Sequence, residues 1–417
     1  MGMPSGMGPR LYNLFPLLVG PVSSWKRHLE RIARMGFDWV YLNPFHEVGF
    51  SGSLYAVKDY YRLHPFFRGQ ATAPDDEILR DFVRAARDRG LDVMMDLVVN
   101  HTAKDSLLAQ RHPAWFLHDS DGGLHSPAAV HPDDPTDVTV WGDLAELDYA
   151  ERPERAEIVS YFRDVATHYA RLGFRGFRCD AAYKVPGTVW SEIVAGVRGA
   201  RADAVFVAET LGCKPEEVRQ LAAAGFDFLF NSAKWWDFRA AWLLEQYEAF
   251  RTIAPSIAFP ESHDTERLIV SLEAQSLSDP AQIEAAYRFR YLFAAFFSSG
   301  VAMPIGFEFG FRRRLDVVRT RPEDWEEPRF DLEEFIAEVN AMKARTAALC
   351  EEGPQHLVTA AGAWPLALRR QRIDGSAPVL GVFNPDAASS ARLDVTQPPF
   401  HVRDLALRPL EGRVLAS

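Results

Sequence analysis

Residues Gly173–Pro186 read GFRGFRCDAAYKVP and combine the apolar composition of a buried strand with charged side chains. In a strand, residues two apart point to the same side, so Arg178 and Asp180 are directed toward one place. Charges that are buried together are unfavourable unless they are paired or used in function. The stretch therefore predicts a buried strand whose C-terminal end carries a functional site.

Strand-like and helical segments alternate on both sides of this stretch. Apolar runs predict eight strands: RLYNLFPLL (10–18), FDWVYLNP (37–44), LDVMMDLVVNH (91–101), FRGFRCD (174–180), AVFVAE (204–209), FDFLFN (226–231), SIAFPES (256–262) and SGVAMPIGF (299–307). Repeated strand–helix units imply a parallel sheet with right-handed crossovers, and eight such units fit a closed barrel better than an open sheet. The predicted fold class is therefore α/β, a (β/α)8 TIM barrel.

The predicted barrel domain covers residues 1–354 and carries a short inserted segment at about residues 102–144, after the third strand. The insertion is irregular and rich in His, Asp, Pro and Gly, and loops of this length inside a domain are usually functional or form small subdomains. From residue 355, short strands and turns without a clear helix predict a small all-β, β-sandwich-like domain over residues 355–417.

The chain has 417 residues, a net charge of −11 and a sequence pI of about 5.6. The sequence lacks the excess of Lys and Arg that is typical of nucleic-acid-binding proteins, which argues against a nucleic-acid partner. The three cysteines have neither the spacing of a zinc site nor that of a disulfide framework. We find no signal peptide and no apolar run long enough to span a bilayer, so we expect a cytoplasmic protein with no membrane partner. These features leave the oligomeric state open.

Polar side chains gather at the C-terminal ends of the predicted strands, which is the end of a TIM barrel that carries the active site. They are Asp96, Asn100 and His101 after the third strand, Arg178 and Asp180 after the fourth, Glu209 after the fifth, Glu261, Ser262, His263 and Asp264 after the seventh, and Glu308 after the eighth. Any one of the acids has about even odds of being only a helix N-cap. As a set, they are expected to converge on one pocket.

Several carboxylates with an arginine and two histidines indicate glycoside chemistry. A retaining glycosidase uses one carboxylate as nucleophile and one carboxylic acid to protonate the leaving oxygen. Arg178 is expected to depress the pKa of Asp180 and keep it ionised. Glu209 follows the apolar run AVFVA, so burial is expected to raise its pKa. His101 and His263 are suited to hydrogen-bonding sugar hydroxyls.

Four motifs, DLVVNH, GFRCD, VFVAET and FPESHD, occur in the order and on the strands that are typical of the α-amylase family, which this sequence therefore resembles. SGSLYAVKDYY resembles the segment after the family's second strand, and the insertion resembles a short domain B.

The resemblance implies a nucleophile, Asp180, an acid/base, Glu209, and a residue that stabilises the transition state, Asp264. It also implies a set of substrate-binding residues, namely Tyr55, Asp59, His101, Arg178, Lys184, His263 and Glu308. No cofactor is required. Asn100 matches a frequent calcium ligand of the family, which leaves Ca²⁺ as an open alternative.

The resemblance implies a retaining enzyme that acts on α-1,4-glucans or malto-oligosaccharides through a covalent glycosyl-enzyme intermediate, as an amylase-like or α-glucosidase-like hydrolase. However, Tyr183 and Lys184 stand where many members have Lys-His, and KVPGTVWSEI resembles maltosyltransferases that use maltose 1-phosphate. Glycosyl transfer, with a phosphorylated donor as one option, is therefore the alternative. A catalytically inactive binding protein is disfavoured because all three catalytic acids are present.

Two further segments allow two interpretations each. FRRRLDVVRTRPEDW (311–325) is either a solvated, ion-paired loop or a site for an anionic group such as a sugar phosphate. KWWDFRAAW (234–242) either lines acceptor subsites or forms a packed helix face.

Overall fold

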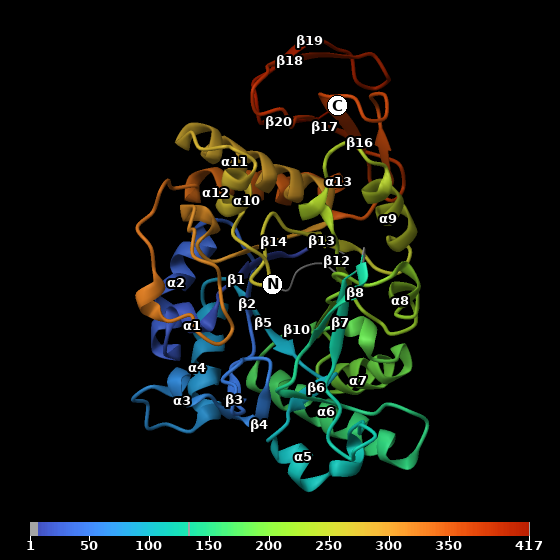
Figure 1. Ribbon diagram of the computed structural model, residues 1–417. Helices are drawn as coiled ribbons and strands as arrows, with labels where there is room; N and C mark the ends of the chain where they lie inside the picture. The colour runs from blue at the N-terminus through green and yellow to red at the C-terminus, as the bar shows by residue number, and fades with distance from the viewer. Residues whose placement is uncertain (1–6, 132–133, 417) are drawn as a thin grey trace.

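The computed structural model describes residues 7–131 and 134–416. Within them, eight parallel strands close into a barrel in the order β1-β14-β13-β12-β11-β10-β5-β2 (Figure 1). The strands are β1 (Arg10–Asn13), β2 (Trp39–Leu42), β5 (Asp92–Leu97), β10 (Gly176–Cys179), β11 (Val205–Ala208), β12 (Phe228–Phe230), β13 (Ser256–Ala258) and β14 (Gly300–Pro304). Each lies inside one of the predicted runs, so the predicted barrel is confirmed.

Most of the described helices surround the barrel and cover its outer face, whereas α5 lies with the segment inserted after β5 (Figure 1). They are α1 (Pro16–Val19), α2 (Val22–Arg34), α3 (Pro65–Arg68), α4 (Asp75–Arg87), α5 (Leu107–Arg111), α6 (Pro153–Leu172), α7 (Gly187–Ala200), α8 (Pro215–Arg219), α9 (Trp242–Phe250), α10 (Leu268–Ala274), α11 (Pro280–Phe297), α12 (Glu333–Arg345) and α13 (Ala347–Cys350). In α2, the apolar residues Trp25, Leu29 and Ile32 recur at helical spacing and are fully buried. None of the described helices combines the length and the apolar composition that a membrane-spanning segment requires.

The barrel interior is filled by side chains from alternating strand positions. Gly176 on β10 faces this interior, where a Cβ would lie only 2.7 Å from Cζ3 of Trp39. Phe177 and Cys179 point the other way, into the large cluster shared with the helices. Because side chains alternate along a strand, Arg178 follows Gly176 on the inner side, immediately above the packed layer.

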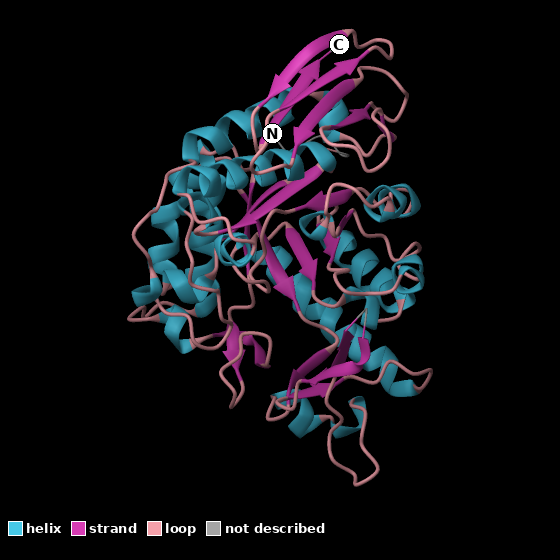
Figure 2. Ribbon diagram, turned by 45° about the horizontal axis from the view of Figure 1, so that its top comes forward, coloured by secondary structure: helices cyan, strands magenta, loops and turns pink. Residues whose placement is uncertain are grey.

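The segment after β5 forms two small antiparallel pairs. β6 (His101–Ala103) pairs with β9 (Leu144–Glu146), and β7 (Ala128–His131) pairs with β8 (Asp134–Val140). The nearby hairpin of β3 (His46–Val48) and β4 (Val57–Leu63) carries the chain between β2 and α3. Both groups of short strands lie at the same end of the barrel (Figure 2).

The C-terminal residues form antiparallel sheets. β15 (Gln355–Leu357), β16 (Leu366–Arg370), β17 (Val379–Asn384) and β20 (Glu411–Ala416) make a four-stranded sheet, and β18 (Ala391–Val395) pairs with β19 (Val402–Leu407). A separate apolar cluster joins residues of both sheets. The predicted all-β composition is confirmed, whereas the domain boundary between residues 354 and 355 stays a prediction.

Helix α11 connects the barrel with these sheets. Phe383 of β17 is fully buried, and its ring centroid lies 5.3 Å from that of Phe293, 5.4 Å from that of Phe296 and 6.0 Å from that of Phe289. Aromatic pairs at these separations contribute beyond their buried area.

Phe383→Ala is expected to lower the free energy of unfolding by about 3–5 kcal/mol, because it removes a buried ring and leaves a cavity between α11 and β17. Urea denaturation followed by tryptophan fluorescence measures the change. Ile373→Ala, at a side chain that is 68% exposed, is the control and should stay within about 0.5 kcal/mol of the parent. Equal stability of the two variants would contradict this packing.

Candidate active site

The charged pair at the end of β10 is formed as the strand alternation predicts. Nη1 of Arg178 donates to Oδ1 of Asp180 over 2.6 Å, and to both carboxylate oxygens of Asp96 over 3.0 Å. Arg178 is 3% exposed and Asp96 is completely buried. The buried guanidinium of Arg178 therefore donates hydrogen bonds to two carboxylates, at the ends of the neighbouring strands β10 and β5.

A hydroxyl network completes the shell around Asp96. Oδ2 of Asp96 accepts from the hydroxyl of Tyr41 over 2.6 Å and from that of Tyr55 over 2.7 Å. The Tyr55 oxygen in turn lies 2.8 Å from Nε2 of His263 and accepts from Nδ2 of Asn43 over 3.0 Å. Because the one hydroxyl proton of Tyr55 is directed to Asp96, Nε2 of His263 is the donor to Tyr55.

Glu209 follows β11 and is fixed by backbone donors. Its Oε2 accepts from the amide of Ala181 over 3.0 Å, and its Oε1 accepts from the amide of Leu211 over 2.6 Å. Ala181 has a φ of 40°, a left-handed conformation that is uncommon for a residue other than glycine. The residue after Asp180 is thus turned so that its N–H meets the carboxylate on the adjacent strand.

Burial raises the pKa of Glu209 to about 7, as the apolar strand before it predicted. The expectation for Asp180 needs a correction. Arg178 does act to lower the pKa of Asp180, but burial has the larger effect and the pKa is raised overall, with the charge of Asp264 adding to the rise. The physical reason is that desolvation of the buried carboxylate outweighs its attraction to Arg178.

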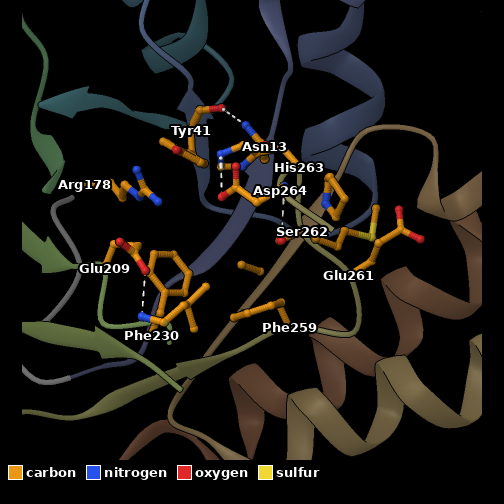
Figure 3. A pocket seen from close by; sticks show the side chains of 14 residues that line it. Asn13, Tyr41, Arg178, Glu209, Phe230, Phe259, Glu261, Ser262, His263 and Asp264 are labelled. Carbon is orange, nitrogen blue, oxygen red and sulfur yellow. Dashed lines mark hydrogen bonds and ion pairs between the residues drawn. The ribbon is translucent and has the colours of Figure 1, made fainter. Parts of the chain in front are cut away.

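The pocket lies above these groups and has one polar and one apolar side (Figure 3). Asp264 is at its edge, with the side chain 53% exposed and Oδ2 3.1 Å from Nε2 of His263. Fourteen residues line the pocket: Asn13, Tyr41, Arg178, Glu209, Leu211, Phe230, Phe259, Glu261, Ser262, His263, Asp264, Ala302, Met303 and Pro304. Glu209 and Asp264, which follow two different strands, therefore line one cavity, and Asp180 is joined to it through Arg178, which is also a lining residue.

Comparisons with known proteins identify relatives of this chain. A sequence profile described as "Glycogen debranching enzyme, glucanotransferase domain" matches residues 10–118. An α-1,4-glucan:maltose-1-phosphate maltosyltransferase of Burkholderia pseudomallei is 31% identical over 395 residues, which are 92% of this chain and 34% of that protein. The maltosyltransferase 2 of Streptomyces coelicolor is 28% identical over 50% of this chain and 32% of its own length.

Solved structures show the same fold. The α-amylase from Geobacillus thermoleovorans complexed with acarbose has a TM-score of 0.75, with 18% identity and 98% of each chain covered. The α-glucosyl transfer enzyme XgtA has a TM-score of 0.79, with 15% identity and both chains fully covered. The resemblance to the α-amylase family is confirmed. The chain spans about a third of the length of the maltosyltransferases that it matches.

His101, predicted to bind a sugar hydroxyl, begins β6 directly after Asn100. Burial lowers its pKa to about 4, so its ring is neutral near pH 7. Its Nδ1 lies 3.4 Å from Nδ2 of Asn100, and its buried Nε2 has no hydrogen-bond partner among the described residues. A buried ring nitrogen of this kind is suited to a substrate hydroxyl.

Of the predicted substrate-binding residues, Arg178 and His263 line the pocket, whereas Tyr55, Asp59, His101, Lys184 and Glu308 are not among its lining residues. Glu308 is completely buried on the outer side of β1, where it accepts from the hydroxyl of Tyr12 over 2.6 Å and pairs with Arg31 of α2. Asp59 lies in β4 and accepts from the amide of Tyr61 over 2.9 Å. Both contacts stabilise segments that support the site, and direct contact of either residue with substrate stays a prediction.

Lys184 is used differently from an exposed acceptor ligand. It ends the 3₁₀ turn Ala182–Lys184 that follows Asp180, and its Nζ donates to the carbonyl oxygen of Ala128 over 2.7 Å. Ala128 is the first residue of β7 and pairs with Val140 of β8. The lysine thus connects the inserted hairpin to the turn that follows Asp180.

The arginine-rich loop after β14 is mostly ion-paired. Arg312 lies 3.0 Å from Glu273, Arg314 lies 3.2 Å from Glu266, and Arg313 pairs with Asp324. These contacts favour the solvated, ion-paired interpretation over a dedicated anion site.

Asn100 was predicted as a possible calcium ligand. Its side-chain amide contacts His101, and the described part of the chain holds no group of three or more His, Cys, Asp or Glu side chains that could bind a metal ion. Calcium ligands also include backbone and amide carbonyl oxygens. Binding of Ca²⁺ at Asn100 therefore stays an open alternative.

Several pocket residues were not predicted. Asn13 ends β1 and donates from Nδ2 to Oδ1 of Asn43 over 2.8 Å, and Asn43 in turn positions Tyr55. Both asparagines follow apolar strands, which is the signal that identified the other strand ends. The apolar wall of Phe230 and Phe259 carries no such signal, because buried strand residues and pocket-lining residues look alike in sequence.

Lys184→Met is expected to increase amide hydrogen exchange in β7 and β8 by at least about tenfold, because a charge-assisted hydrogen bond that anchors β7 is lost. Mass spectrometry of peptides covering these strands measures the change. Lys184→Arg should retain slow exchange. Lys104→Met removes a cation of the same inserted segment whose side chain makes no hydrogen bond or ion pair with the described residues, and it should have no effect. Unchanged exchange in Lys184→Met would show that the hairpin is held by other contacts.

Proposed function

We propose that this chain is a retaining enzyme that cleaves or transfers α-linked glucose units of α-1,4-glucans or malto-oligosaccharides. The observation that carries the proposal is the pairing of two unlike carboxyl groups. Asp180 is bound to a guanidinium, whereas Glu209 is buried with its pKa raised to about 7 and is joined to the residue after Asp180 by a hydrogen bond. A nucleophile and an acid with different environments are what double displacement requires.

In the proposed first step, a carboxylate oxygen of Asp180 attacks the anomeric carbon. The glycosidic C–O bond breaks, and Glu209 gives its proton to the leaving oxygen, which leaves a glycosyl ester on Asp180 and an ionised Glu209. In the second step, Glu209 takes a proton from the acceptor hydroxyl while the acceptor oxygen displaces Asp180. Asp264, His263 and His101 are proposed to bind hydroxyls of the sugar ring.

The acceptor decides between hydrolysis and transfer. Water gives an amylase-like or α-glucosidase-like hydrolase, and a sugar hydroxyl gives a transglycosylase. The identity of 31% with a maltose-1-phosphate maltosyltransferase over 92% of this chain supports transfer as the second candidate, with a phosphorylated donor as one form of it. The same carboxyl groups serve both reactions.

We also propose that the protein acts in the cytoplasm and needs no cofactor. Its three cysteines, Cys179, Cys213 and Cys350, are all unpaired, which fits a reducing compartment. The proposed steps use only carboxyl groups of the chain, so neither Ca²⁺ nor another group is assigned a role in them.

The proposed function predicts turnover of α-glucans that depends on Asp180. The protein would be incubated separately with maltotetraose, maltose, trehalose, sucrose, and maltose 1-phosphate plus maltotetraose, and the products would be separated by chain length. Glucose and maltose alone would show hydrolysis, and products longer than the donor would show transfer. Asp180→Ala should abolish both. Turnover that survives this change, or no turnover of any α-glucoside, would contradict the proposal.

The pKa of Glu209 predicts the basic limb of the pH profile. Glu209 must be protonated to act, so kcat/KM should fall tenfold per pH unit above about pH 7. The acidic limb should lie above that of an ordinary aspartate, because Asp180 must be ionised and its pKa is raised. Glu209→Gln should lower kcat by about 10²–10⁴-fold and remove the basic limb. Glu216→Gln on the exposed helix α8 is the control, and a basic limb that persists in Glu209→Gln would assign it to another group.

A further inference from the structure

The turn after β12 places two adjacent tryptophans in opposite environments. The 3₁₀ turn Ala233–Trp235 follows the strand directly. Trp236 is 3% exposed, and its ring stacks on that of Phe293 of α11 at 5.5 Å between centroids. Trp235 is 50% exposed. The two interpretations of the KWWDFRAAW segment are thus divided between neighbours: Trp236 packs, and Trp235 faces solvent.

Several hydrogen bonds fix the backbone around the exposed ring of Trp235. Oδ1 of Asn231 accepts from the amide of Ala233 over 3.1 Å, and the amide of Trp235 donates to the carbonyl of Ser232 over 3.0 Å. Nη1 of Arg290 donates to the carbonyl oxygens of Lys234 and Trp236, each over 3.4 Å. A large apolar ring that is fixed in an exposed position, without gaining burial, is available for a ligand.

The ring is continuous with the apolar wall of the pocket. Trp235 meets Phe259 edge-to-face, with 6.0 Å between centroids and 89° between planes, and Phe259 meets Phe230 at 5.8 Å and 76°. Phe230 and Phe259 line the same cavity as Glu209 and Asp264 (Figure 3). A row of three aromatic rings thus runs from the wall of the catalytic pocket to solvent.

A hydrogen-bond donor accompanies this ring. Nζ of Lys234 lies 5.9 Å from the centroid of the Trp235 ring, and the structure records no ion pair or hydrogen bond for this ammonium among the described residues. Burial lowers the pKa of Lys234, with the charge of Glu261 opposing. A flat apolar face beside a donor matches a pyranose ring, which has an apolar C–H face and a rim of hydroxyls.

We propose that Trp235 and Lys234 form a second sugar subsite, which holds a glucose ring of the glucan chain beyond the ring bound at the catalytic carboxylates. The subsite rests on the proposed function for its ligand class. It makes Trp235 a residue that selects for substrate chain length. A substrate too short to reach the turn after β12 gains nothing from it.

The test compares kinetics with maltotriose and maltoheptaose. Trp235→Ala is expected to raise KM for maltoheptaose about tenfold, with kcat changed less than about twofold, because the stacking contact holds ground state and transition state equally. The effect on p-nitrophenyl α-glucoside should be absent. Trp235→Tyr should restore most of the affinity for maltoheptaose, and Lys234→Met should raise KM about threefold.

Trp325→Ala is the matched control. That tryptophan is 39% exposed, but its ring meets His28, Phe309 and Phe311, none of which line the pocket. The control should leave all three substrates unchanged. A Trp235→Ala variant with wild-type KM for maltoheptaose, or with equal losses on long and short substrates, would overturn the subsite.

Binding separates failure of the subsite from failure of the proposed function. Titration calorimetry of maltoheptaose against the parent protein and Trp235→Ala requires no turnover. One outcome is that the parent turns over no α-glucoside and still binds maltoheptaose about tenfold more tightly than Trp235→Ala does. This result would support the subsite and contradict the proposed catalytic function. Equal binding by the two proteins, or no binding by either, would overturn the subsite.

Discussion

The ion pair of Arg178 with Asp96 and Asp180 is the constraint on which the site depends. Three charged groups meet at the inner end of β5 and β10, with Asp96 fully buried and Arg178 nearly so. Without the guanidinium, two carboxylates would face each other in a poorly solvated pocket, which is strongly unfavourable. Arg178, paired with both carboxylates, thus joins two barrel strands and keeps Asp180 in place. Even with this ion pair, burial raises the pKa of Asp180 overall.

The packing below the ion pair determines where it lies. Gly176 leaves room for the ring of Trp39, so the barrel closes tightly beneath Arg178. The turn above it is equally constrained. Ala181 adopts a left-handed conformation and donates to Glu209, and Lys184 ends the same turn with a hydrogen bond to the inserted hairpin. Asp180, Glu209 and the inserted hairpin are therefore linked through five consecutive residues, 180–184, which connects the hairpin with the carboxyl groups of the proposed chemistry.

Much of the fold could be predicted because the spacing of apolar residues and the polarity of the residues that follow them are local properties of the sequence. The eight apolar runs, the polar residues at their ends and the four motifs are all read within a few residues of one another. The contacts of two candidate site residues depend on segments that are far apart in the chain. Glu308 follows β14 on the side that faces α2, where it contacts Arg31 and Tyr12. Nζ of Lys184 donates to a carbonyl oxygen 56 residues away in sequence. The binding of substrate by either residue stays a prediction.

The sequence by itself determined the barrel, the β-rich C-terminal part, the resemblance to the α-amylase family and the identity of the candidate carboxyl groups, because strand periodicity and short motifs suffice for these. Only the tertiary structure decided how one arginine is shared between two carboxylates, which of two adjacent tryptophans is exposed beside the pocket, and what Lys184 holds. These depend on distances between segments far apart in the chain, and on burial, which sets the balance between desolvation and charge pairing.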